Sequence, residues 1–203
     1  MRKDYFFLIL AFVVLTVSTF IFFFLKTKVK DKEKILEKFH LKTVMIMGDA
    51  TLLRKGKRDK LKIDKSLYEQ DIIITGAKSK IEVVYQHKYR ILIKEKTLFK
   101  VNSLKKILNN EQKEINLHSF SLQLGKAYFK LSRLGENTRW KLKTPAINAG
   151  VRGTIFGAQT DKKVSVLKVR EGRVQVKRNI RFGDEIRPEI IKQIEVPVSK
   201  NEK

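Results

Sequence analysis

The chain has 203 residues, of which 42% are hydrophobic and 33% charged, a composition that favours a folded domain over a disordered chain. It contains no cysteine, which excludes disulfide frameworks, thiolate zinc sites and cysteine nucleophiles. With 45 Lys and Arg residues against 21 Asp and Glu, the formal net charge is +24, and such a surface attracts polyanions.

The first predicted element is a transmembrane anchor over residues 1–25. Residues 5–25 read YFFLILAFVVLTVSTFIFFFL and contain no charged side chain. A helix of about 20 apolar residues spans the hydrocarbon core of a bilayer. The run stays bulky to its end, whereas a cleavable signal peptide ends in small residues. We therefore expect an uncleaved signal anchor.

A charged helical stalk is predicted next, over residues 26–40, where Ile35, Leu36 and Phe39 have helix-compatible spacing. Arg2 and Lys3 before the anchor favour a cytoplasmic N-terminus. The lysines after the anchor favour the opposite orientation. Flanking charge alone therefore does not set the orientation.

Residues 41–197 are predicted to form an all-β domain of many short strands. The segments IEVVY (81–85) and YRILI (89–93) alternate apolar and polar residues, as half-buried strands do. The polar, Asn-rich stretch at 103–116 is expected to be an exposed loop or a short helix. Residues 198–203 are expected to be a disordered tail.

A short pattern of glycine followed by alternating apolar residues begins at Gly48, Gly125 and Gly172. Each glycine is predicted to adopt a positive φ in a turn that launches a strand. Many short strands with tight corners suit a β-roll or an antiparallel β-sandwich, and both alternatives stay open at this point.

The stretch INAGVRGTIFG (147–157) could bind phosphate or form a structural corner. It lacks the spacing of a Walker loop and of a dinucleotide fingerprint, and TIF favours a strand over the helix that both motifs need. We therefore predict a corner at residues 150–153. Arg152 is expected to be held by the fold, through carbonyls or through a carboxylate such as Glu171.

No catalytic, cofactor-binding or metal-binding residues are predicted, and we expect the protein not to be an enzyme. His40, His87 and His118 lie singly, without metal-ligand spacing. No Gly-x-Ser-x-Gly nucleophile elbow occurs. The aspartates next to glycines or between strands are interpreted as turn residues; they are Asp49, Asp71, Asp161 and Asp184.

Two blocks in this domain, TPAINAGVRGTIF (144–156) and VSVLKVREGRVQVK (164–177), closely resemble the FecR domain family. Three earlier segments resemble it as well: GDATLLRKGK (48–57), LYEQDIIITGAKSKIEVVY (67–85) and YRILIKEKTLFKV (89–101). In the second of these, Gln70 stands where the family usually has glycine. The resemblance covers about residues 41–180.

The resemblance implies an all-β module with a β-helix-like or β-roll-like core, here preceded by one transmembrane helix. The antiparallel β-sandwich is the alternative. The residues that match the family's hallmark are interpreted as structural; they are Thr144, Pro145, Gly150, Val151, Arg152, Gly153, Thr154, Glu171 and Gly172.

The resemblance also implies a single-pass protein of the bacterial inner membrane, with the bulk of the chain in the periplasm. The expected function is non-catalytic: protein binding, scaffolding or sensing of an envelope signal, with an unknown protein partner in the cell envelope. Family members relay signals to sigma factors, but we expect the four residues before the anchor to be too few to bind a sigma factor. The alternative function is binding of an anionic polymer, either cell wall, anionic lipid or nucleic acid, of which nucleic acid is the least expected.

Overall fold

The computed structural model describes residues 34–109, 111–161 and 164–179. Within these ranges there is no helix that could cross a membrane. The predicted anchor (1–25) and tail (198–203) lie outside the described residues, as do residues 26–33 of the predicted stalk and the end of the predicted β domain.

All regular structure in the described ranges is β-strand. The strands are β1 (Lys34–Lys38), β2 (Leu41–Met47), β3 (Ala50–Arg54), β4 (Lys57–Lys60), β5 (Ser66–Leu67), β6 (Ile72–Thr75), β7 (Lys80–Tyr85), β8 (Tyr89–Ile93), β9 (Leu98–Leu108), β10 (Glu114–Leu131), β11 (Thr138–Lys143), β12 (Ile147–Thr160) and β13 (Ser165–Arg178).

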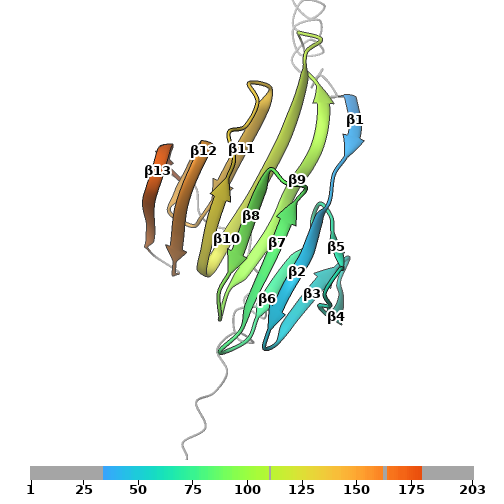
Figure 1. Ribbon diagram of the computed structural model, residues 1–203, viewed down its shortest axis with the longest axis vertical. Helices are drawn as coiled ribbons and strands as arrows, with labels where there is room; N and C mark the ends of the chain where they lie inside the picture. The colour runs from blue at the N-terminus through green and yellow to red at the C-terminus, as the bar shows by residue number, and fades with distance from the viewer. Residues whose placement is uncertain (1–33, 110, 162–163, 180–203) are drawn as a thin grey trace, which may run out of the picture. The chain divides into compact units, whose positions relative to one another are not determined.

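The strands join into one sheet that curls around a common core as a half-barrel (Figure 1). The main path runs β4-β3-β6-β9-β10-β8-β7-β2-β5, β1 is added beside β9, and β11, β12 and β13 extend the sheet beyond β10. Every pair along the main path is antiparallel, as are β10 with β12, β11 with β12 and β12 with β13, whereas β10 and β11 run parallel. The predicted all-β class is therefore confirmed. The predominance of antiparallel neighbours differs from the stacked parallel coils of a β-helix, and the continuous pairing differs from two separate sheets.

The long strand β10 belongs to two walls of this curled sheet. Its first part, up to Leu124, pairs with β9 and β11, and its second part, from Gly125, pairs with β8 and β12. Gly125 has a φ of +92°, and a Cβ at this position would lie 2.3 Å from Thr97 Oγ1. Glycine is therefore required where β10 passes from one wall to the other.

The core is built by the alternation that the sequence shows. In β7, Ile81, Val83 and Tyr85 point inward, and β8 contributes Tyr89, Ile91 and Ile93 in the same way. An aromatic cluster fills the interior under β10 to β12. Phe129 and Phe156 stack with ring centroids 4.6 Å apart, and Trp140 meets both rings edge-on.

The secondary structure of two segments differs from the sequence prediction. Lys34–Lys38 forms the exposed strand β1, which pairs with β9, and not the end of a helical stalk. The stretch 103–116 is not a loop or helix between two halves, because it forms the end of β9, a tight turn and the start of β10. Backbone pairing with a neighbouring strand overrides the weak local preference in both segments.

The three glycines of the recurring pattern all have positive φ, but only one of them makes a turn. Gly48 links β2 to β3. Gly125 and Gly172 lie inside the continuous strands β10 and β13. The predicted corner at 150–153 is likewise absent, because β12 runs unbroken from Ile147 to Thr160. Instead, the register between β12 and β13 shifts on both sides of Ile155.

Candidate functional site

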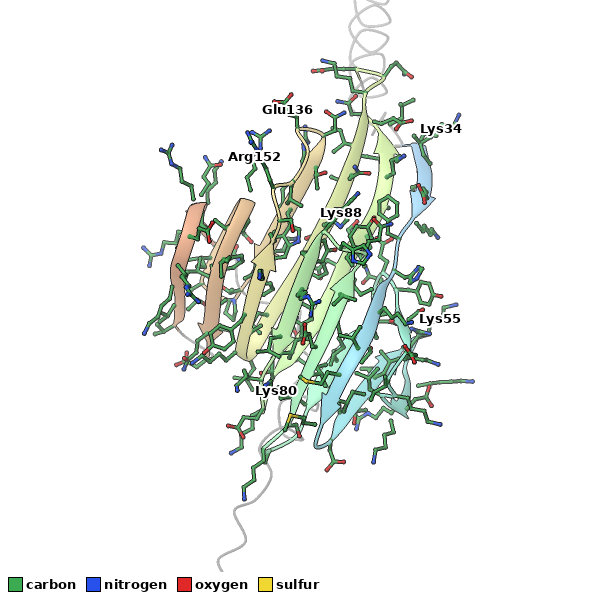
Figure 2. The ribbon with its side chains drawn as sticks, in the orientation of Figure 1. Lys34, Lys55, Lys80, Lys88, Glu136 and Arg152 are labelled. Atoms are coloured by element: carbon green, nitrogen blue, oxygen red, sulfur yellow. The ribbon has the colours of Figure 1, made fainter. Side chains whose placement is uncertain are left out.

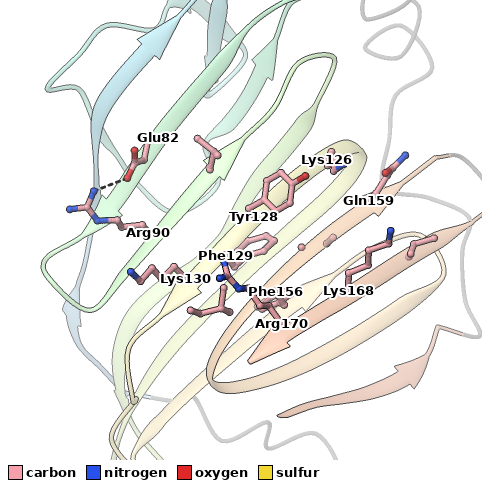
Figure 3. Close-up of a pocket in the computed structure, with 15 residues that line it drawn as sticks. Glu82, Arg90, Lys126, Tyr128, Phe129, Lys130, Phe156, Gln159, Lys168 and Arg170 are labelled. Carbon is pink, nitrogen blue, oxygen red and sulfur yellow. Dashed lines mark hydrogen bonds and ion pairs between the residues drawn. The ribbon is translucent and has the colours of Figure 1, made fainter. Parts of the chain in front are cut away.

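A groove of about 590 Å³ opens on the outward face of the sheet, over β8, β10, β12 and β13 (Figure 3). This volume lies within the range of small-molecule sites. The groove exists because β10 and β12 place alternate residues outside the core: Phe129 and Phe156 are buried, whereas Tyr128 and Ile155 face outward.

The floor of the groove is apolar and centres on Tyr128. Gly157 is the cross-strand partner of Tyr128, and a Cβ on Gly157 would lie 3.0 Å from Tyr128 Cδ1. The tyrosine ring therefore lies over the backbone of a residue that has no side chain to displace it. Leu92, Ile155 and Val166 complete the apolar surface. Tyr128 is 40% exposed, so an aromatic surface is available to a ligand.

The walls of the groove are cationic. Lys126 and Lys130 of β10 stand on one side, and Lys168 and Arg170 of β13 stand on the other (Figure 3). Lys126 Nζ lies 5.3 Å from the centroid of the Tyr128 ring. A fifth cation, Arg90, is paired with the only acid in the lining, Glu82, at 2.9 Å. These four cations have no ion pair with any acid that the structure describes, and an apolar floor between them fits a ligand that carries both an apolar part and negative charge.

The hallmark residues Thr144 and Pro145 form the turn between β11 and β12. The Thr144 hydroxyl donates to the Ile147 carbonyl and accepts from the Ile147 N–H, both at 3.1 Å. The backbone N–H of Thr144 also donates to that carbonyl, at 2.8 Å. Thr144 thus closes a tight hairpin turn in which Pro145 occupies a position that suits its fixed φ.

Gly153, Thr154 and Gly172 form a bulge between β12 and β13. The register shifts on both sides of Ile155, and Gly153 and Gly172 have φ values of +59° and +86°. A Cβ on Gly172 would lie 2.3 Å from Thr154 Cγ2 and 2.7 Å from the Gly153 carbonyl oxygen. The two glycines therefore let the strands remain paired around the buried Thr154.

Val151 and Gly150 have ordinary positions in β12. Val151 is buried opposite Val174, and Gly150 lies opposite Gln175, with no close neighbour at the place of a Cβ except one carbonyl oxygen at 3.9 Å. Gly150 is thus not required by backbone conformation or by space.

Arg152 is not held as predicted. Its side chain is exposed at the rim of the molecule (Figure 2), and no hydrogen bond or ion pair joins it to any described residue, Glu171 included. Its cross-strand partner is Arg173, whereas Glu171 lies opposite Ile155. The one-residue offset introduced by the bulge separates Arg152 from Glu171 in register.

Two buried polar arrangements were not predicted. Asp71, interpreted as a turn residue, is 1% exposed and accepts two hydrogen bonds from Arg54, Nε to Oδ1 at 2.8 Å and Nη2 to Oδ2 at 2.6 Å. The pKa of Arg54 is raised by this hydrogen bonding. His118 is 3% exposed, and its Nδ1 lies 2.9 Å from the Tyr89 hydroxyl. Burial, reinforced by Lys88, lowers the pKa of His118 to about 4.

No group of three or more His, Cys, Asp or Glu side chains that could hold a metal ion occurs among the residues that the structure describes. Both buried arrangements have plain structural roles: Asp71 also accepts the Tyr68 N–H at 2.7 Å, and His118 packs among Phe39, Tyr85 and Tyr89.

Comparison with known families identifies the family of this chain. The FecR protein family matches residues 71–175, which is more than half of the chain. The chain belongs to the FecR family. This is a non-catalytic family whose domains typically act in signal transduction and sensing. No curated protein and no solved structure gave a match.

The structure bears on Gln70, which stands where the resemblance to the family leads us to expect glycine. Gln70 has a φ of +72°, a conformation that glycine adopts without strain. The Gln70 amide donates a hydrogen bond to the Asn102 carbonyl at 2.9 Å, and its backbone N–H donates to the Val101 carbonyl at 2.7 Å. These contacts to β9 offset part of the backbone strain.

Proposed function

We propose that this protein is a membrane-anchored, non-catalytic FecR module that faces the periplasm and binds a protein partner or senses a signal in the cell envelope. Membership of the FecR family and the apolar segment at 5–25 support this proposal. The observation that carries the binding role is the open groove, because its apolar floor and cationic walls form a surface that the fold itself does not use.

The predicted location is tested with reporters fused after Lys203. A reporter that is active only in the periplasm should be active in the fusion, and one that is active only in the cytoplasm should be silent. The reverse pattern would contradict the proposed orientation, whatever the groove binds.

The groove is tested with an anionic aromatic probe, 2-naphthalenesulfonate, titrated calorimetrically into the full chain in neutral detergent micelles. We expect binding that the double variant Lys126→Glu/Lys168→Glu weakens by about tenfold or more, because one of the two cations in each wall is replaced by an acid. The matched control Arg139→Glu/Lys141→Glu makes the same charge change on exposed positions of β11, outside the groove, and should retain binding. Equal loss in both variants would show that only net charge matters.

A second candidate function is binding of an anionic polymer such as cell wall, or of anionic lipid. The observation that favours it is the formal charge of +24, together with the cations that face outward from β10 to β13. Binding of the full chain to peptidoglycan, to phosphatidylglycerol vesicles or to DNA should then weaken steeply as salt is raised. Binding that is indifferent to salt would argue against this function.

A further inference from the structure

The strand β13 is an open edge of the sheet. Among the described residues it pairs only with β12, along its entire length (Figure 1). The outer side of a 14-residue strand therefore presents backbone N–H and C=O groups that no described strand uses. A long unpaired edge is a ready template for the addition of another extended segment.

The inward face of β13 is aliphatic and incompletely covered. Val169 lies opposite the buried Phe156, and Val176 lies opposite the buried Ala149, so both valines share the face of the core. Nevertheless Val169 is 45% exposed and Val176 is 49% exposed. Leu167 and Val174, on the same face, are only partly buried. This face would gain burial from an additional strand with aliphatic side chains.

The outward face of β13 carries a net positive charge, with Glu171, opposite the outward-facing Ile155, as its one acid among the described residues. Lys168, Arg173 and Lys177 point to this face, because their partners on β12 are the outward-facing Gly157, Arg152 and Asn148. Arg152 and Arg173 are directly opposed, and like charges in that position are unfavourable. Negative charge placed beside Arg173 would relieve this repulsion.

We infer that β13 accepts an extended segment of a partner protein in which acidic and aliphatic residues alternate. The partner's backbone would pair with the open edge, its acidic side chains would lie beside Lys168, Arg173 and Lys177, and its aliphatic side chains would cover Val169 and Val176. This inference rests on the proposed function, because it names the partner chemistry of a binding module.

A second copy of this chain is a poorer occupant of the edge. Two β13 strands paired with each other would bring their rows of Lys and Arg side chains together, in a chain whose formal charge is already +24. A linear polyanion is also a poorer fit, because it would satisfy the cations and leave Val169 and Val176 uncovered.

The test uses the full chain in neutral detergent micelles and two labelled peptides of about ten residues. One alternates Glu and Val, and the other has the same composition in two blocks. We expect fluorescence anisotropy to show binding of the alternating peptide alone. Hydrogen exchange should slow by about tenfold or more in residues 165–178, since an added strand protects the edge.

Variants outside the groove locate the contact. Arg173→Glu/Lys177→Glu should weaken the alternating peptide by about tenfold or more, whereas the matched control Arg139→Glu/Lys141→Glu should change its affinity by less than about threefold. Val169→Thr/Val176→Thr keeps the β-branched shape and should also weaken binding. Thermal melting of each variant confirms folding. The reporter fusions and the titration of 2-naphthalenesulfonate into the unaltered chain are measured without the peptide and report on the proposed function separately.

Four outcomes would overturn the inference. Equal binding of the block peptide would show that charge alone drives binding. Loss of peptide binding to the same extent in the β11 control would do the same. Concentration-dependent self-association that disappears in Val169→Thr/Val176→Thr would identify a second copy as the occupant. Binding that emerges only after removal of residues 180–203 would mean that the chain itself occupies the edge.

Discussion

Replacement of Gly172, compared with replacement of Gly56, distinguishes the cost of backbone strain from the cost of a steric clash. We expect Gly172→Ala to lower the free energy of unfolding by about 2 to 4 kcal/mol, because the new Cβ would clash with Thr154 and with the Gly153 carbonyl. The matched control is Gly56→Ala: Gly56 has a similar φ of +82° but no atom within 4 Å of the Cβ position. It should cost about 1 kcal/mol. Denaturant unfolding measures both, and equal losses would refute the bulge explanation.

His118 predicts how stability depends on pH. Burial lowers its pKa from 6.5 to about 4 in the folded state, so between these values the unfolded chain binds the proton and the folded chain does not. The free energy of unfolding should therefore fall as pH drops from about 6.5 to about 4, by about 3 kcal/mol at most for this residue. The free energy of unfolding should change less with pH across this range in His118→Gln than in the unaltered protein. An unchanged slope in the variant would assign the pH dependence to other groups.

At the scale of elements, one ion pair ties β3 to the loop before β6. Asp71 is almost fully buried, and Arg54 also donates to the Ser66 carbonyl at 2.8 Å. We expect Asp71→Asn to destabilise the fold by about 2 to 4 kcal/mol, because it leaves Arg54 and the Tyr68 N–H without their anionic partner. Chemical unfolding at neutral pH measures the loss.

The matched control for Asp71 is Asp64→Asn. Asp64 forms an ion pair with Lys42 at 2.9 Å, but both side chains are more than half exposed. Asn also tolerates the φ of +65° at this position. The substitution should change stability by less than about 0.5 kcal/mol. Similar costs for the two variants would mean that burial is not what makes the Arg54–Asp71 pair important.

Most strands could be predicted from the sequence, but two kinds of element could not. The end of β9 could not be predicted, because its buried residues Val101, Leu104 and Ile107 are spaced three apart and not two apart. A register shift against β10 accounts for the first of these two steps. The sequence predicted a corner at Gly153 and a turn at Gly172, where the structure has a bulge. Glycine with a positive φ occurs in turns and in bulges alike. Only the pairing partner decides between them.

The groove also could not be predicted, for a different reason. Its lysines and arginines are a few among 45, and they come from strands that are distant in the sequence. By contrast, the hairpin turn at Thr144 and Pro145 is encoded locally, because the Thr144 hydroxyl bonds to Ile147, three residues further along the chain. A turn that depends on neighbouring residues can be predicted from one sequence, whereas a surface formed by the pairing of distant strands cannot.

At the scale of the whole molecule, the excess of positive charge should weaken the fold by self-repulsion. Raising NaCl from about 0.05 to about 0.5 M should increase the melting temperature by a few degrees, since salt screens exposed charges. The increase of the melting temperature with salt should be smaller in Arg139→Glu/Lys141→Glu, because this variant has a lower net charge. Scanning calorimetry of the full chain in neutral detergent measures both, and a melting temperature that falls with salt would contradict the expectation.

The passage of β10 through both walls of the sheet has a mechanical consequence. The backbone of β10 is shared by the β9–β11 side and the β8–β12 side, so separating either side from the sheet breaks backbone pairing of this strand. A pull on the β13 margin would be transmitted through β12 to β10 and from there to the opposite wall. We therefore expect the sheet to respond to force as one cooperative unit, which is compatible with the proposed signalling role.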